Sequence, residues 1–435
     1  MSDYMFKLES HLNAEQNRVV AEVQTAASAA NVNLFLAGGA MRDMLGGFPI
    51  RDLDFTIEGN PMKLARQVGE RLGAKRMVED EYRRFVELEL PGGVTAQIAM
   101  SRHERYVRPG GKPQITPAPI YDDLRRRDFT VDAIALSLNR GSRGLLVDPV
   151  NGLADLERRE LRTAYPQAFP DDPARLPRLV RLHHRLGFTI EERTAVQFEN
   201  ALASNLQRLI TKRAAFAELR NIAEESSPLE ILRDLDKWNL LALFSSSLTA
   251  KNLNAGALTK LEKLRKSLPW AALDGHGGWR VFLFVLTGKL TPREKADLYR
   301  TVEMSKEEID SGKKLSAHAH KLEQVLKSER LQKPSQIYQA LSGAGLNEIL
   351  YLLYYSQQRL VHDRIRNYVQ KYLPAAKEIT DAEVGAGGEK PGTAKFEKRR
   401  EEMIVARLNG RAKRPQPQAL EPVPMVSGRG RAIRQ

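Results

Sequence analysis

The chain has 435 residues, 42% of them hydrophobic and 28% charged, which is typical of a water-soluble protein that is too long for a single core. It contains no cysteine, so disulfides and thiolate metal sites are excluded. It also lacks an apolar run of about eighteen residues and a signal-like N-terminus, so we expect a cytoplasmic protein without a membrane span. The formal net charge of +14 favours a polyanionic partner, although a generic basic surface fits the charge equally well.

The N-terminal third alternates between helical and strand patterns. Apolar periodicity predicts helices over 11–30 and 61–73, and strands over 32–37, 51–58, 84–90, 94–100, 131–138 and 145–148. From 173 to about 372 the three- and four-residue apolar spacing is helical almost throughout, without a solenoid repeat. The turn-rich segment 385–392 precedes one last charged helix, and the Pro-, Gly- and Arg-rich sequence from Gly410 onwards is predicted to be disordered.

The first cluster of functional interest is "LFLAGGAMRDMLGGFPIRDLDFTIEG". A predicted strand ends at Gly38-Gly39 and leads into a helix, an arrangement that lets backbone N–H groups approach an anion. Asp52 and Asp54 then share one face of the next strand, about 6.6 Å apart, with a repulsion of roughly 2–3 kcal/mol. A divalent cation between them would explain that cost, whereas a solvent-facing polar stripe on an edge strand is the alternative.

This pattern, G-G-x-x-R-D-x-L-x-G-x-x-x-x-D-x-D, resembles the signature of the class II nucleotidyltransferases. That family includes the CCA-, CC- and A-adding tRNA nucleotidyltransferases and the bacterial poly(A) polymerases. The matching positions are Gly38, Gly39, Arg42, Asp43, Leu45, Gly46, Asp52 and Asp54. The resemblance implies that Asp52 and Asp54 are the catalytic residues and hold two Mg²⁺ ions, and that the glycines and Arg42 bind the nucleotide.

The resemblance also implies an α+β fold class, with an N-terminal polymerase-β-like nucleotidyltransferase domain followed by an all-α neck, body and tail. The expected boundaries are a head at 1–162, a neck with the base template at 163–225, a body at 226–375, a tail that binds the tRNA elbow at 376–412, and a disordered basic end at 413–435.

A second cluster, "DDLRRRDFTVDAIAL", places charged residues directly before a predicted strand. It resembles the family motif that meets the ribose, which implies that Arg126, Arg127 and Asp128 bind the nucleotide. The family usually has Asn where this chain has Asp132. A carboxylate there is unfavourable near a triphosphate unless it joins the metal ligands or pairs with an arginine.

A third cluster, "DDPARLPRLVR", resembles the family motif E-D-x-x-R-x-x-R, with Asp172, Arg175 and Arg178 on its positions. At a helix start, Asp172 and Arg175 would share a face. A carboxylate that accepts from an exocyclic amine, beside an arginine that donates to a ring nitrogen, suits cytosine and adenine and mismatches uracil and guanine. Asp172 as an ordinary N-cap is the alternative, and Pro177 is expected to disturb a helix at this point.

We therefore expect an enzyme that adds C and/or A to the 3′ end of tRNA from CTP and ATP, with release of pyrophosphate. A poly(A) polymerase and a non-catalytic RNA-binding relative are the alternatives, and no protein partner is predicted. The tail segment resembles that of bacterial family members, and phosphate contacts there are as plausible as a solvated helix face for its basic residues Lys395, Lys398, Arg399, Arg400 and Arg407.

Overall fold

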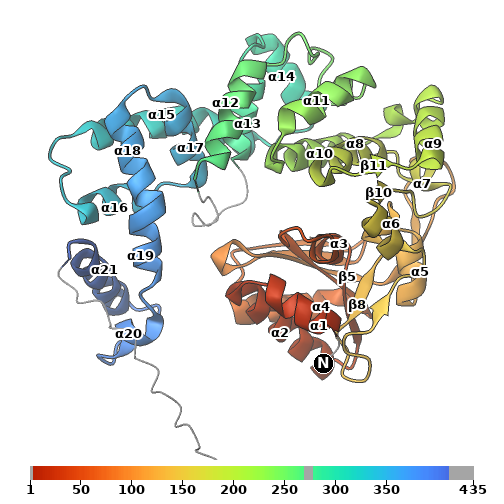
Figure 1. Ribbon diagram of the computed structural model, residues 1–435, viewed down its shortest axis with the longest axis horizontal. Helices are drawn as coiled ribbons and strands as arrows, with labels where there is room; N and C mark the ends of the chain where they lie inside the picture. Colours follow the sequence, from red (N-terminus) through yellow and green to blue (C-terminus); the bar gives the residue numbers. More distant parts are fainter. Residues whose placement is uncertain (1–2, 269–277, 411–435) are drawn as a thin grey trace, which may run out of the picture.

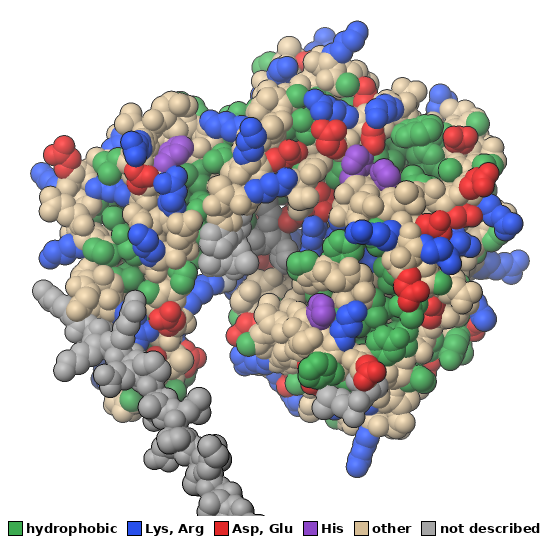
Figure 2. Space-filling view, viewed as in Figure 1, with side chains coloured by type: hydrophobic (Ala, Val, Ile, Leu, Met, Phe, Trp, Pro, Cys, Tyr) green, Lys and Arg blue, Asp and Glu red, His purple; other side chains and the backbone are tan. Residues whose placement is uncertain are grey.

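The computed structural model describes residues 3–268 and 278–410. A sheet domain, the head (residues 3–161), lies at one side, and helices arch away from it to the opposite side (Figure 1). We call α7–α10 the neck, α11–α19 the body, and α20 with α21 the tail. The tail returns to the level of the head without lying against it, and Figure 2 shows open space between the two.

The core of the head is a seven-stranded mixed sheet with strand order β3-β4-β5-β2-β1-β8-β9. Its pairs are antiparallel apart from β2 and β5, which run parallel. A separate hairpin joins β6 to β7, and β10 pairs in parallel with β11, so the end of the head is joined to the neck. The strands are β1 (Asn33–Ala37), β2 (Asp52–Glu58), β3 (Arg76–Asp80), β4 (Phe85–Glu89), β5 (Thr95–Met100), β6 (Arg102–Arg105), β7 (Gln114–Pro117), β8 (Ala135–Ser137), β9 (Leu146–Val147), β10 (Glu160–Leu161) and β11 (Thr189–Ile190).

Strand β2 shows how the sequence alternation positions the site. Leu53 and Phe55 point into the core and are fully buried, whereas Asp52 is exposed and Asp54 half-buried on the other face. Burial of the apolar face fixes the register, because a shift by one residue would place both carboxylates in the core.

The helices of the head and neck pack around this sheet and beside it. They are α1 (Asp3–His11), α2 (Ala14–Ala29), α3 (Gly39–Gly46), α4 (Pro61–Leu72), α5 (Ile120–Arg125), α6 (Gly152–Arg158), α7 (Ala168–Asp171), α8 (Arg175–Leu186), α9 (Glu192–Ala203) and α10 (Lys212–Glu224).

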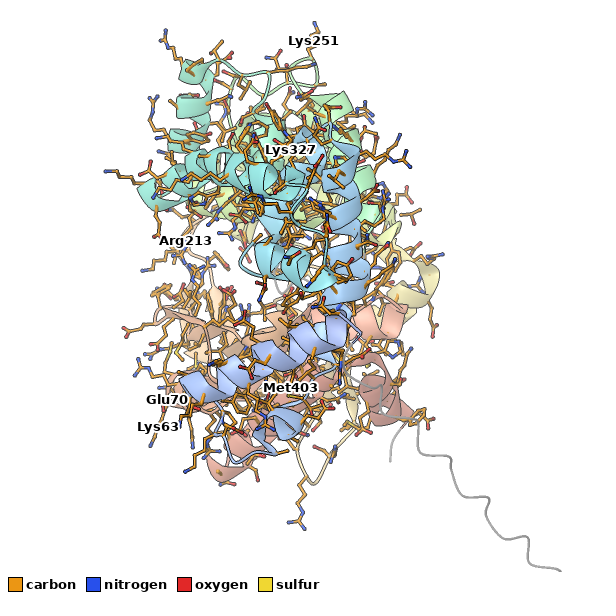
Figure 3. The ribbon with its side chains drawn as sticks, turned by 90° about the vertical axis from the view of Figure 1, so that its left-hand side faces the viewer. Lys63, Glu70, Arg213, Lys251, Lys327 and Met403 are labelled. Carbon is orange, nitrogen blue, oxygen red and sulfur yellow. The ribbon has the colours of Figure 1, made fainter. Side chains whose placement is uncertain are left out.

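The body and tail contain no strand among their described residues. Their helices are α11 (Pro228–Lys237), α12 (Ala255–Lys266), α13 (Trp279–Leu286), α14 (Pro292–Thr301), α15 (Lys306–Lys327), α16 (Pro334–Ser342), α17 (Leu346–Tyr355), α18 (Arg359–Asn367), α19 (Leu373–Lys377), α20 (Asp381–Gly385) and α21 (Ala394–Leu408). A π-helical turn, Tyr368–Tyr372, connects α18 to α19. Viewed from the tail side, α21 crosses the lower half of the molecule and the body fills the upper half (Figure 3).

Several predicted elements differ in the structure. The helix expected over 11–30 is α2, which begins at Ala14 because Asn13 is its N-cap and forms a capping box with Gln16. The separate helix α1 before it was not predicted. The strand expected over 131–138 is reduced to β8, since residues 130–132 form a 3₁₀ turn. Strand β3 and the β6–β7 hairpin were not predicted; both are rich in charged or polar residues, and their faces are at most partly buried.

The helical pattern predicted across 269–277 and the disorder predicted after Gly410 concern residues outside the described part of the chain. No described helix is long and apolar enough to cross a membrane.

Candidate functional site

The glycine pair forms the turn between β1 and α3 and lies directly against Asp54. Gly38 has φ +67°, and a Cβ there would lie 2.9 Å from Nη1 of Arg127 and 3.2 Å from Oδ2 of Asp54. The next backbone N–H, that of Gly39, donates to Oδ2 of Asp54 at 3.1 Å. Glycine is therefore required by both backbone conformation and close approach.

Asp52 and Asp54 lie on the same face of β2, next to β5. The hydroxyl of Thr95, the residue in register with Asp52, donates to Oδ1 of Asp52. Burial and then the charge of Asp52 raise the pKa of Asp54 to about 6, against the opposing effect of Arg127 and Arg42. The strand thus holds two carboxylates that repel each other, as expected for a site that binds a cation.

These two carboxylates suit a hard divalent cation that keeps open positions. Magnesium is usually bound through one or two carboxylates plus substrate phosphates, without a full protein cage. Gln97, in register with Asp54 on β5, supplies an amide where a third carboxylate would otherwise stand. Among the described residues there is no cluster of three or more His, Asp or Glu suited to a metal.

Asp132 pairs with an arginine, which is one of the two outcomes that its position allowed. Its Oδ1 accepts from Nη1 of Arg42 at 2.5 Å, and Nε and Nη2 of Arg42 both donate to Oδ1 of Asp43 at 2.9 Å. Burial raises the pKa of Asp132 despite the opposing charge of Arg42. Arg42 is buried within these ion pairs beside Gly39, so it is held by two carboxylates of the head and does not extend freely toward solvent.

Arg126 and Arg127 are both anchored by one buried carboxylate, that of Asp123. Arg126 donates to Oδ1 and Arg127 to Oδ2, at 2.5 and 3.0 Å. Arg127 also reaches β2, where it donates to the hydroxyl of Thr56 at 3.0 Å. Burial opposes the ionisation of Asp123, but the two guanidinium groups outweigh it and lower its pKa to about 2. Asp123 therefore orients both predicted nucleotide ligands.

Asp128 connects the head to the neck. Its Oδ2 accepts from Nη1 of Arg178 at 2.6 Å, and its Oδ1 accepts from the backbone N–H of Phe129 at 3.0 Å. Burial disfavours its charge, but Arg178 and Arg175 lower the pKa of Asp128 well below its usual range. The side chain of Arg178 is still 35% exposed, so it retains donors for a ligand.

Arg175 is more confined than Arg178. It is 4% exposed, and its Nη atoms donate to the phenol of Tyr165 at 2.8 Å and to the carbonyls of Ala168 and Arg126, each at 3.0 Å. Its Nε is buried and has no hydrogen-bond partner in the described part of the chain.

The predicted helical relationship between Asp172 and Arg175 is wrong. Helix α8 begins at Arg175, and Asp172 precedes it in extended conformation as the C-cap of α7. Oδ1 of Asp172 accepts from the N–H of Ala174 at 3.2 Å, so Asp172 orders the connection without being the helix N-cap. Pro177 lies in the first turn of α8, where backbone N–H groups need no intrahelical acceptor, so it does not break the helix.

Ion pairs lock α8 and α10 of the neck against the head. Nη2 of Arg185 on α8 donates to Oδ2 of Asp43 at 2.5 Å. Glu225, just after α10, binds Arg51 of the head and Arg181 of α8, both at 3.0 Å. The helix that carries Arg175 and Arg178 is thereby fixed relative to the strand that carries Asp52 and Asp54.

Sequence reasoning missed three of these contributors. Asp123 stands three and four residues before Arg126 and Arg127, a spacing that signals helical ion pairs. Thr95 and Arg185 carry no local signal, because their roles depend on strand register and on the docking of the neck.

The five basic residues of the tail lie on α21, far from the head (Figure 1). Arg399 pairs with Glu389 at 3.1 Å, Arg400 with Asp381, and Arg407 with Glu383 at 3.6 Å. Lys395 and Lys398 are exposed and have no ion-pair partner among the described residues.

Comparison with known proteins shows which proteins share the head domain that carries the site. The model of the poly(A) polymerase head domain matches residues 34–162, which include the glycine turn, both carboxylates and Arg126–Asp128. Curated relatives that extend beyond this domain are tRNA nucleotidyltransferases. The chain is thus similar to tRNA nucleotidyltransferases, and its residues 34–162 match the poly(A) polymerase head domain.

Three similar proteins illustrate the range of relatives. An A-adding enzyme of Halalkalibacterium halodurans is 29% identical over 82% of this chain and 84% of its own length. A CC-adding enzyme of Deinococcus radiodurans is 35% identical over 48% of this chain and 54% of its own. An A-adding enzyme of Aquifex aeolicus is 32% identical over 59% of this chain, but the match spans only 31% of that longer protein.

A solved structure of a CCA-adding enzyme shares the fold over nearly the whole chain. An apo form of a CCA-adding enzyme superimposes with a TM-score of 0.52 at 24% identity, and the match covers 95% of this chain and 96% of that one. The predicted α+β class, with a sheet head followed by helical parts, is confirmed.

Proposed function

We propose that this protein is a template-independent nucleotidyltransferase that adds C and/or A to the 3′ end of tRNA from CTP and ATP. The observation that carries the proposal is the pair Asp52 and Asp54 on one face of β2, beside a glycine turn and Arg127. The names of the related proteins, A-adding and CC-adding, support the same substrates.

The proposed cofactor is a pair of Mg²⁺ ions held by Asp52 and Asp54. Bound there, Mg²⁺ would lower the pKa of the RNA 3′-hydroxyl and neutralise charge at the α-phosphate and the departing pyrophosphate. In the reaction the 3′-oxygen forms a bond to the α-phosphorus as the bond to pyrophosphate breaks.

The remaining residues of the head position the nucleotide. The glycine turn leaves room for phosphate oxygens beside the N-terminus of α3, and Arg127 lies against it as a fixed positive charge. We assign contact with the ribose to Asp128 and Arg126; their ion pairs with Arg178 and Asp123, which fix their orientation, support this role.

Base choice is assigned to Asp172, Arg175 and Arg178. A carboxylate accepts from the exocyclic amine of cytosine or adenine, and a guanidinium donates to the neighbouring ring nitrogen. Three of the five donors of Arg175 are engaged within the protein, and its buried Nε has no partner among the described residues. Arg178, whose side chain is 35% exposed, is the arginine with more capacity to meet the base.

The test is an addition assay with tRNA transcripts that end before CCA, after C, or after CC, each with labelled CTP or ATP. We expect incorporation that stops at one A, and its loss in Asp52→Ala and Asp54→Ala. Glu70→Gln is the matched control, because Glu70 is an exposed acid of α4 at the edge of the head (Figure 3) and should leave turnover unchanged.

The same assay decides between the alternatives. Addition of many A residues would contradict the tRNA assignment in favour of a poly(A) polymerase. RNA binding without incorporation of either nucleotide would indicate a non-catalytic relative, although Asp132 and Pro177, the departures that suggested one, are both accommodated.

A further inference from the structure

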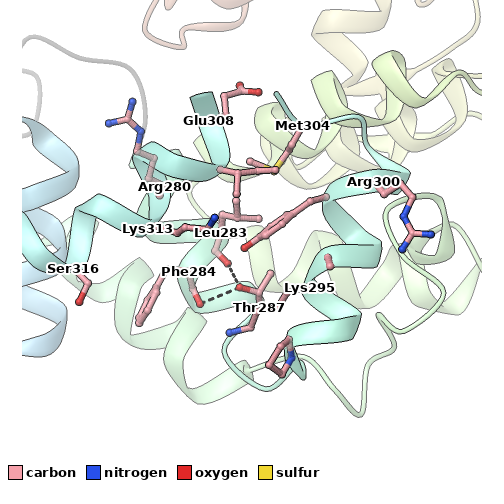
Figure 4. A pocket seen from close by; sticks show the side chains of 15 residues that line it. Arg280, Leu283, Phe284, Thr287, Lys295, Arg300, Met304, Glu308, Lys313 and Ser316 are labelled. Carbon is pink, nitrogen blue, oxygen red and sulfur yellow. Dashed lines mark hydrogen bonds between the residues drawn. The ribbon is translucent and has the colours of Figure 1, made fainter. Parts of the chain in front are cut away.

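The body contains a second concave site, remote from the carboxylates of the head. A pocket of about 730 Å³ lies among α13, α14 and α15 (Figure 4). Its apolar lining includes Leu283, Phe284, Tyr299, Met304 and Ile309. No lining residue belongs to the head or neck, so the nucleotide site does not account for this pocket.

The charged groups of the pocket are mostly basic. The ammonium groups of Lys295 and Lys313 point into it, whereas the guanidinium groups of Arg280 and Arg300 point away (Figure 4). Lys295 has no ion pair in the described part of the chain, and Lys313 has only an exposed pair with Asp310 at 3.2 Å. Glu308 is the single acidic residue of the lining, and it pairs outside the pocket with Arg220 at 3.3 Å.

A glycine in the middle of α15 leaves this pocket open. Gly312 lies inside a 22-residue helix, where glycine costs about 1 kcal/mol relative to alanine. It does not have the positive φ that would require glycine, and a Cβ there would meet nothing within 4 Å. Packing within the protein therefore does not require a glycine at position 312, and the surface of α15 beside the pocket is open there.

Two aromatic rings provide contact surface. Phe284 is 42% exposed at the pocket, an uncommon state for a large apolar side chain beside a core. Tyr299 lines the opposite helix, and burial raises its pKa, so its phenol is a neutral hydrogen-bond donor at physiological pH. The lining therefore complements a ligand that has both an apolar ring and an anionic group.

We propose that the pocket binds a small amphipathic anion, an aromatic ring that carries a phosphate, sulfonate or carboxylate. The ring packs on Phe284 and Tyr299, and the anionic group lies between Lys295 and Lys313. The complementary charge and the open helix surface at Gly312 are the observations that select this occupant.

The experiment titrates the full-length protein with 8-anilinonaphthalene-1-sulfonate, an aromatic sulfonate that fluoresces in apolar sites. We expect saturable binding of one probe per chain. Gly312→Leu fills the pocket while raising helix propensity, and Lys295→Glu reverses the charge, so each should weaken probe binding about tenfold or more.

Matched controls separate the pocket from general effects. Gly256→Leu changes another helical glycine with open space around it, and Lys314→Glu changes the exposed neighbour of Lys313 outside the lining. Both should bind the probe as the unmodified protein does. All four variants should retain tRNA 3′-end addition, so a failed proposal here is distinct from failure of the proposed function.

Competition identifies the chemical source of the natural ligand. Displacement by adenosine 5′-monophosphate would indicate a nucleotide, and displacement by 2-naphthoate alone would indicate an aromatic carboxylate; either supports the proposal. Equal probe binding by Gly312→Leu or Lys295→Glu in folded protein, no saturable binding at all, or displacement by tRNA alone would overturn it.

Discussion

Nη1 of Arg178 donates to Oδ2 of Asp128 at 2.6 Å, so a candidate base-reading residue of the neck is held by a candidate ribose-binding residue of the head. The bond joins residues fifty positions apart and fixes the guanidinium in one orientation. In the proposed enzyme this contact would couple recognition of the base to recognition of the sugar.

Weakening this contact is expected to relax nucleotide choice. Asp128→Asn replaces a charge-assisted hydrogen bond by a neutral one, a loss of about 1–2 kcal/mol, or roughly 5- to 30-fold in discrimination. The measurement is kcat/KM for CTP, ATP, UTP and GTP. Unchanged ratios with only a lower kcat would show that Asp128 does not orient Arg178.

Removal of the charge on Asp54 is expected to stabilise the metal-free protein. A carboxyl whose folded pKa is about 6, above its ordinary 3.8, lowers stability at neutral pH when ionised, so Asp54→Asn should raise the free energy of unfolding by up to about 3 kcal/mol. Urea unfolding at pH 7.5 in EDTA measures this.

The same unfolding assay tests metal binding. Mg²⁺ should raise the urea concentration at the midpoint of unfolding for the unmodified protein, because a ligand stabilises only the state that binds it. The midpoint of Asp54→Asn should remain nearly unchanged. Equal shifts in both proteins would place the metal elsewhere.

The contact between Asp43 and Arg185 predicts an asymmetry between two substitutions. Asp43→Ala leaves Arg42 and Arg185 without a shared buried carboxylate and should cost about 3–5 kcal/mol. Arg185→Met leaves Asp43 paired with Arg42, so it should lower the free energy of unfolding by clearly less than Asp43→Ala does. Equal losses in denaturant unfolding would contradict the arrangement.

Asp123 predicts acid sensitivity. Its folded pKa of about 2 lies below the ordinary 3.8, so its ionised form contributes about 2 kcal/mol that is fully present above pH 4 and is lost as the pH falls toward 2. The stability difference between the unmodified protein and Asp123→Asn, measured by urea unfolding, should therefore be constant from pH 7 to about pH 4.5 and shrink below it. If the stability difference between the two proteins grew as the pH falls, the lowered pKa of Asp123 would be contradicted.

The tail predicts a contrast between lysines and arginines. The double substitution Lys395→Glu with Lys398→Glu should weaken tRNA binding several-fold and reduce the slope of log K against log salt concentration by about 1–2. The reason is that neither ammonium group has an ion-pair partner among the described residues, so both can bind phosphates. Arg399→Gln should act mainly on tail stability, since Arg399 pairs with Glu389. Lys63→Glu on α4 of the head is the control. An equal effect of the control would indicate non-specific attraction.

Local patterns were enough for much of the fold and for the carboxylates. The alternation around Leu53 and Phe55 predicted β2 and the common face of Asp52 and Asp54, because strand periodicity is a property of neighbouring residues. The start of α8 was misplaced, since Asp172 orders a turn and the helix begins only at Arg175. The contact of Arg42 with Asp132 was out of reach, because it joins residues ninety positions apart.

The two-residue pairing of β10 with β11 has a consequence for errors made by such an enzyme. It ties the chain just before α8 to the chain just after it, so the helix cannot swing as an independent arm. A change that displaces α8 would therefore also displace strand β10 at the end of the head. Variants of the β10–β11 pair should consequently incorporate wrong nucleotides more often and also have a lower kcat.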